Sequence, residues 1–104
     1  MFQLRIYTLR TGEALEQYAT VHWHRHIASL EAFGVSTHGI WTDRGGAHRL
    51  VALVSFPAGA DPTAVTDEYM ASPGFKADMD GFDPADIVGV ATILLDATPS
   101  SPIR

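Results

Sequence analysis

The stretch from Thr11 to Gly34 constrains the fold more than any other part of the chain, because its pattern predicts one long amphipathic helix. Thr11 suits the N-cap position, and Gly34 suits the position after the last turn, where a left-handed conformation is common. At about 100° per residue, one apolar arc of roughly 100° holds Leu15, Ala19, His22, His26, Ser29, Leu30 and Phe33. Tyr18 and Trp23 fall at the edges of this arc, which we expect to face the core.

The pair His22 and His26 is the strongest chemical signal in the sequence. Side chains four residues apart are neighbours on a helix, so both imidazoles are expected on the apolar face. A single histidine there is commonly a neutral core residue, with one ring nitrogen bonded to a backbone carbonyl. Two are harder to bury, because all of their ring nitrogens lose water. The pair therefore predicts a cavity for a small molecule, without naming the molecule or the reaction.

Composition limits the class of protein. A chain of 104 residues predicts one domain, which we place at residues 1–98, with residues 99–104 as a C-terminal tail. With 46% hydrophobic and 18% charged residues, the chain is apolar for a small monomer, which indicates a second buried surface. The net charge of −5 argues against nucleic acid and against an anionic membrane as partners. Without a visible signal peptide or any cysteine, we expect a cytoplasmic protein that lacks disulfides and thiolate chemistry.

The remaining segments complete a β-α-β-β-α-β order. Alternating and β-branched residues predict strands at Phe2–Arg10, Val35–Asp43, His48–Phe56 and Asp86–Asp96. Asp61 as an N-cap before Pro62 predicts a second helix to about residue 71, and residues 74–82 predict a helical turn or an irregular segment. This order predicts an α+β, ferredoxin-like fold with helices on one face of an antiparallel sheet. Strands that are apolar on both faces imply that a second copy covers the other face, giving a homodimer.

Several motifs, taken in order, resemble the NIPSNAP family. They are QLRIYTLRTG at residues 3–12, HIASLEAFG at residues 26–34, Gly39-Ile40-Trp41, and Ser-Pro-Gly-Phe at residues 72–75. The resemblance covers residues 2–97, and it implies a dimeric α/β barrel. In that barrel two ferredoxin-like protomers pack sheet to sheet, each with a pocket between its sheet and its helices. Relatives in the superfamily include cofactor-independent monooxygenases acting on aromatic polyketides, haem-degrading enzymes, dehydratases, lyases and cyclases.

Histidine chemistry gives the candidate site. Imidazole titrates near neutral pH, so we expect His26 to transfer a proton and His22 to orient or polarise beside it. We expect the substrate, an aromatic or polyketide-like molecule, to contact Arg5, Tyr7, Tyr18, Trp23, His38 and Trp41. Arg5 would hold a carboxylate or an enolate, and His38 would join only if its strand face looks toward the helix. Ordinary core packing of the aromatic residues, and an ion-paired or exposed arginine, are the alternatives.

The predicted chemistry needs no cofactor. His22 and His26 have the spacing of two helical zinc ligands, but no acidic residue accompanies them, and haem has no further support. The sequence therefore predicts a cofactor-independent enzyme of a natural-product or secondary-metabolite pathway, of the monooxygenase, cyclase, isomerase or dehydratase type. The alternatives are a dimeric, stress-related protein that binds a small molecule without turnover, and a module whose dimer surface is its whole function.

Overall fold

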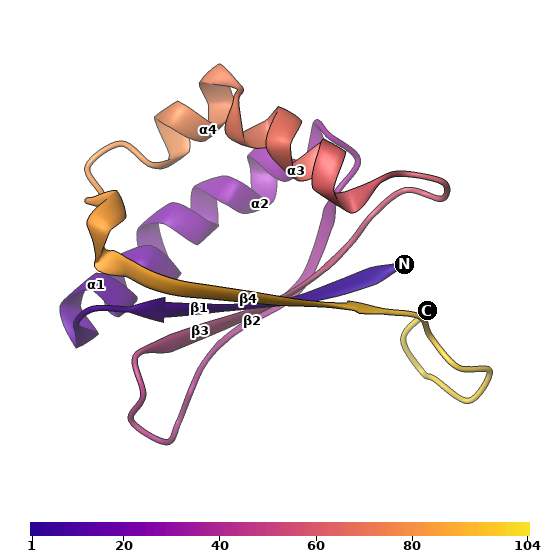
Figure 1. Cartoon of the computed structure of the whole chain (residues 1–104), viewed down its shortest axis with the longest axis horizontal. Helices are drawn as coiled ribbons and strands as arrows, with labels where there is room; N and C mark the ends of the chain where they lie inside the picture. Colours follow the sequence, from indigo (N-terminus) through magenta and orange to yellow (C-terminus); the bar gives the residue numbers. More distant parts are fainter.

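The computed structural model describes all 104 residues. A four-stranded antiparallel sheet carries the helices on one of its faces (Figure 1). The strands are β1 (Phe2–Leu9), β2 (Ser36–Thr42), β3 (Arg49–Ser55) and β4 (Ile87–Leu95), in the spatial order β2-β3-β1-β4. The helices are α1 (Gly12–Gln17), the π-helical turn η1 (Tyr18–His22), α2 (Trp23–Glu31), α3 (Pro62–Met70), α4 (Pro73–Asp78) and the 3-10 turn η2 (Pro84–Asp86). The predicted α+β, ferredoxin-like arrangement is confirmed.

Capping residues set the ends of the helices. Thr11 Oγ1 accepts a hydrogen bond from a main-chain N–H of the first turn of α1 at 3.0 Å, and Asp61 does the same for α3 at 3.0 Å. Gly34 follows the long helix with φ of 76°, a conformation that favours glycine. Ser72 caps α4, so the segment predicted as a helical turn or an irregular stretch begins as a short helix.

The long helix predicted over residues 11–34 is present, but it is not a uniform α-helix. In the π turn η1 the N–H of Trp23 donates to the carbonyl of Tyr18, five residues back instead of four. Side chains five residues apart on an α-helix point about 140° away from each other. The wider turn brings Tyr18 and Trp23 together, with ring centroids 6.4 Å apart. Both residues, placed by the sequence pattern at the edges of the apolar arc, are buried in the core.

The two faces of the sheet differ in what covers them. Beneath the helices lie the fully buried side chains of β3, which are Leu50, Ala52 and Val54. The opposite face, called here the open face, carries Trp41 and Ile93, which are 53% and 50% exposed. No helix of the chain covers the open face (Figure 1). No helix is both long enough and apolar enough to cross a bilayer.

Candidate active site

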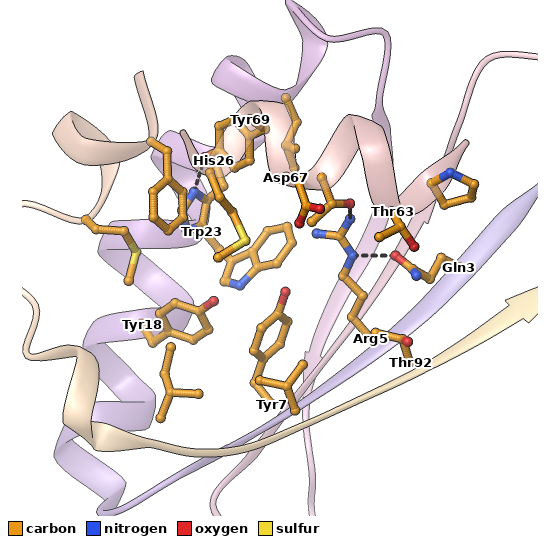
Figure 2. A pocket seen from close by; sticks show the side chains of 18 of the residues that line it. Gln3, Arg5, Tyr7, Tyr18, Trp23, His26, Thr63, Asp67, Tyr69 and Thr92 are labelled. Atoms are coloured by element: carbon orange, nitrogen blue, oxygen red, sulfur yellow. Dashed lines mark hydrogen bonds between the residues drawn. The ribbon is translucent and has the colours of Figure 1, made fainter. Parts of the chain in front are cut away.

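A cavity of about 590 Å³ lies between the sheet and the helices (Figure 2). Strand β1 contributes Gln3, Arg5 and Tyr7, which alternate with residues of the open face. The long helix contributes Tyr18, Trp23 and His26. Most of the wall is aromatic or aliphatic, and the few polar groups converge on the interior, as is typical of a small-molecule site.

His26 begins a buried chain of hydrogen bonds. The Tyr69 hydroxyl donates to Oδ2 of Asp78 at 2.6 Å, which leaves the Tyr69 oxygen to accept a hydrogen bond from Nδ1–H of His26. Oδ2 of Asp78 also lies 3.4 Å from Nδ1. This arrangement leaves the lone pair of His26 on Nε2, which has no hydrogen-bond partner within the protein. Because His26 lines the cavity, Nε2 is available to a ligand.

Asp78 anchors this chain, and sequence reasoning missed both Asp78 and Tyr69. The Asp78 carboxylate is buried, and its Oδ1 accepts a hydrogen bond from the Ser29 hydroxyl at 2.9 Å. Each carboxylate oxygen therefore has a donor, as a buried charge requires. The local sequence KADMD gives no sign of this role, because nothing in it distinguishes Asp78, the last residue of α4, from Asp80, which follows the helix.

Burial determines the protonation states of His26 and Tyr69. It lowers the pKa of His26 from 6.5 to about 4, and the nearby Asp78 carboxylate opposes this effect only in part. The imidazole is therefore neutral near pH 7. Burial also raises the pKa of Tyr69, and the Asp78 carboxylate raises it further, so the Tyr69 hydroxyl remains a donor.

His22 lies beside this chain but not in the cavity. It is 0% exposed. Its Nδ1–H donates to the backbone carbonyl of Asp78 at 2.8 Å, and its Nε2 accepts from the Gln17 amide at 3.1 Å. The prediction that His22 lines the cavity with His26 is wrong, because neighbouring segments satisfy both of its ring nitrogens. Its observed contacts join α4 to the long helix.

Arg5 is a buried cation without a carboxylate partner. Arg5 is only 5% exposed. Its guanidinium donates hydrogen bonds to Gln3 Oε1 at 2.8 Å and to Thr66 Oγ1 at 3.2 Å. Asp67 lines the exposed rim of the cavity, but no carboxylate oxygen lies within 4.0 Å of Arg5. Two neutral acceptors leave the charge and most of the N–H groups uncompensated. The geometry suits an anionic ligand.

Tyr7, Tyr18 and Trp23 form a second polar group in the cavity wall. Their ring centroids lie 5.4 to 6.4 Å apart. The Nε1–H of Trp23 is buried and makes no hydrogen bond of normal length and angle, although the Tyr18 hydroxyl is close enough to be affected by this donor. Figure 2 shows this nitrogen turned toward the hydroxyls of Tyr7 and Tyr18. Burial raises the pKa of Tyr18, and the adjacent Tyr7 adds to this effect, so the Tyr18 hydroxyl stays protonated.

His38 and Trp41 lie on the open face, away from the cavity. The register between β2 and β3 shifts between Thr37 and Gly39, so His38 occupies a bulge. Its Nε2 lies 2.7 Å from the Ser55 hydroxyl. The prediction that His38 and Trp41 contact a ligand in the cavity is wrong, because both lie on the face of the sheet opposite the cavity.

The structure thus gathers most of the predicted site residues around one cavity, namely Arg5, Tyr7, Tyr18, Trp23 and His26. No group of three or more histidine, aspartate or glutamate side chains converges as metal ligands. The rings of His22 and His26 do not face a common position where both could bind one metal ion, because the Nδ1–H groups of the two rings donate to different oxygens.

Solved structures share this fold. The chain is similar to an uncharacterized NIPSNAP domain protein from Burkholderia xenovorans, with a TM-score of 0.72, 15% identity and 97% of each chain covered. A NIPSNAP family protein from Agrobacterium tumefaciens gives a TM-score of 0.79 at 17% identity, covering 99% of this chain and 97% of that one. A putative antibiotic biosynthesis monooxygenase from Deinococcus radiodurans gives 0.62 at 12% identity, covering 100% and 99%. Identities this low establish the fold alone.

A comparison with curated proteins gives no match. The model of the NIPSNAP family, in contrast, matches residues 2–102, which is nearly the whole chain. This match covers every strand and helix that builds the cavity. The chain belongs to the NIPSNAP family.

Proposed function

We propose that this protein is a cofactor-independent enzyme in which His26 transfers a proton to or from a small anionic molecule. The observation that carries the proposal is the hydrogen-bonded chain of His26, Tyr69 and Asp78, which leaves Nε2 of a neutral imidazole open to the cavity. Arg5 supplies the charge that attracts a carboxylate or an enolate. The aromatic wall suits an aromatic or polyketide-like body.

The hydrogen bonds of His26, Tyr69 and Asp78 support the proposed role of His26 as a base. When Nε2 takes a proton, Nδ1–H still donates to Tyr69, and the Asp78 carboxylate, 3.4 Å from Nδ1, compensates the new positive charge. Burial lowers the pKa of His26 to about 4, so the ring by itself is a weak base. An anion bound nearby favours the charged ring and raises this pKa. Substrate binding and activation of the base are therefore coupled.

The reactions that suit this site begin with proton transfer beside a carbonyl or a phenol. They include monooxygenation of an electron-rich aromatic, cyclisation, isomerisation and dehydration, within a natural-product or secondary-metabolite pathway. The similarity in fold to a putative antibiotic biosynthesis monooxygenase from Deinococcus radiodurans is in keeping with such a pathway. We further propose a cytoplasmic homodimer that binds neither nucleic acid nor membrane, in line with the net charge of −5.

A second candidate function is binding without turnover, as in a stress-related protein that sequesters a small molecule. The low pKa of His26 favours this candidate, because Nε2 of a ring that stays neutral can only accept a hydrogen bond from a ligand. Both functions use the same cavity and the same Arg5.

Substitution of His26 separates the two candidates. We expect His26→Gln to lower turnover of a panel of aromatic acids by about 10²-fold or more, while the affinity for those acids largely survives. His24→Gln is the matched control, because His24 lies on the same helix but is exposed, and it should leave both quantities unchanged. Equal loss of affinity and turnover in His26→Gln, or no turnover of any acid by the wild type, would support sequestration.

A further inference from the structure

One end of the cavity holds donors that lack an acceptor. The Nε1–H of Trp23 is buried and makes no hydrogen bond within the protein, which is unfavourable for a polar group that has lost its water. The neighbouring Tyr18 hydroxyl is a further protonated group, and the π turn η1 holds both residues on the cavity side. An uncharged oxygen acceptor, such as a carbonyl, fits this place, because the donors there carry no charge.

The other end of the cavity holds a cation that lacks an anion. Arg5 lies two residues from Tyr7 on the same face of β1, which separates the two ends by about 7 Å along the strand. In Figure 2, Tyr7 lies below the indole of Trp23 and the guanidinium of Arg5, with its hydroxyl pointing toward them. A single ligand can therefore reach both ends if it carries an acid group and a carbonyl a few bonds apart.

We propose that the cavity binds keto acids with a flat body, taking the acid group on Arg5 and the carbonyl oxygen on the Trp23 N–H and the Tyr18 hydroxyl. This inference rests on the proposed function, because it assigns the substrate class on which His26 acts. The ring centroids of His26 and Trp23 are 5.2 Å apart. The base and the N–H group that binds the carbonyl oxygen would therefore contact neighbouring atoms of one ligand.

The reaction that follows is enolisation. Nε2 of His26 takes a proton from the carbon next to the carbonyl, and the electron pair of the broken C–H bond forms the new C=C bond. The carbonyl π pair moves to oxygen, where the Trp23 N–H and the Tyr18 hydroxyl stabilise the enolate. The proton returns from His26 to the oxygen or to carbon, so an isomer or the starting compound leaves and no oxidant is consumed.

Matched probes test the binding mode. The acids are phenylpyruvate, benzoylacetate and β-benzoylpropionate, which place the ketone at increasing distances from the carboxylate. The comparison compounds are γ-phenylbutyrate, an acid without the ketone, and butyrophenone, a ketone without the acid. We expect at least one keto acid to bind about tenfold or more tightly than γ-phenylbutyrate in calorimetry, and to shift the indole N–H resonance of Trp23 in the NMR spectrum.

Variants assign each end of the ligand. Trp23→Phe should weaken the preferred keto acid about tenfold and leave γ-phenylbutyrate unchanged, because only the ketone uses the indole N–H. Arg5→Gln should weaken both acids and leave butyrophenone unchanged. Trp41→Phe, on the open face, is the control for loss of an indole and should bind every probe as the wild type does.

The outcomes separate failure of this inference from failure of the proposed function. The inference is overturned if no keto acid binds more tightly than γ-phenylbutyrate, or if Trp23→Phe affects both acids equally. In either case an acid that binds through Arg5 would leave the proposed function standing. Enzyme-catalysed exchange of the α-protons for deuterium, lost in His26→Gln, supports both. Exchange that persists in His26→Gln, with binding as expected, would retain the binding mode and reject the role of His26.

Discussion

Among single residues, Tyr69 gives the clearest prediction for stability. Its hydroxyl lies between His26 and Asp78 and makes a hydrogen bond with each of them. Replacing Tyr69 with Phe keeps the ring but leaves a buried donor and a buried acceptor without this partner. We expect a loss of about 1–3 kcal/mol in the free energy of unfolding, measured by urea denaturation. Tyr7→Phe is the control, because its hydroxyl faces the cavity, and it should cost little. Similar losses in the two variants would contradict the structural role of the Tyr69 hydroxyl.

His26 should make stability depend on pH in a defined window. Above its unfolded pKa of 6.5, both the folded and the unfolded states hold a neutral ring. Below pH 6.5 His26 becomes protonated in the unfolded state, whereas in the folded state it stays neutral until about pH 4. Stability therefore falls as pH falls through this window, by up to about 3 kcal/mol from this residue.

Urea denaturation between about pH 7 and about pH 4 measures this effect. His26→Gln should remove the contribution, so its stability should fall less steeply over the same range. His24→Gln, which changes an exposed ring, should keep the wild-type slope. A wild-type slope in His26→Gln would show that other groups cause the acid sensitivity.

The sequence predicted the individual site residues where local periodicity decides which way a side chain points. Arg5 and Tyr7 share a face of a regular strand, and His26 lies on the inner face of a helix. Asp78 and Tyr69 were missed because each acquires its role only from a partner brought close by tertiary packing. Their hydrogen bonds join α2, α3 and α4, and no spacing in the sequence encodes that contact.

Among the elements, the π turn η1 places Tyr18 and Trp23 in the cavity. Deletion of Thr20, an exposed residue of this turn, should convert it to an α-helical turn and rotate one flank by about 100° relative to the other. We expect the variant to keep its helical circular dichroism but to lose the near-ultraviolet signal of the packed aromatic rings. Binding of the preferred acid should fall with that signal.

Thr20→Ala is the matched control for this deletion. It removes only the hydroxyl that donates to the Glu16 carbonyl at 2.7 Å and keeps the residue count of the turn. It should retain the near-ultraviolet signal and the binding. Full binding by the deletion variant would show that the extra residue of η1 does not position the cavity wall.

The same turn explains where the helical pattern misled. A wheel drawn at a constant angle assumes one hydrogen-bonding period throughout, so it put Tyr18 and Trp23 at the edges of the apolar arc. Nothing in the letters YATVH signals the longer period. The bulge at His38 is the equivalent in a strand, where one extra residue reverses the assignment of faces that alternation gives. In both elements the type was predictable and the local irregularity was not.

For the whole molecule, the topology was predictable because its determinants are local. Thr11, Asp61 and Gly34 mark helix ends by their own chemistry, and the strands between them alternate or are apolar throughout. The order of elements then leaves few ways to build a sheet with helices on one side. The order of elements does not specify what covers the open face of the sheet, where large apolar residues remain exposed.

We expect the open face to pair with that of a second copy, because an exposed apolar surface of this kind is rare on a monomer. Trp41 and Ile93 lie on it, from β2 and β4, and both are about half exposed. Trp41→Lys or Ile93→Lys would bury an unpaired charge in such an interface, and should weaken association by about 10²-fold or more. Sedimentation velocity over a concentration series measures the shift from dimer to monomer.

Val21→Lys is the control for these changes, because Val21 is an exposed apolar residue of η1, on the helical layer. It should leave the association constant unchanged. A wild-type protein that stays monomeric at all concentrations would reject the dimer, and unchanged association in both Trp41→Lys and Ile93→Lys would place the interface elsewhere. If the pairing is correct, each helix layer and its cavity face outward, so both cavities of the dimer remain open to substrate from opposite sides.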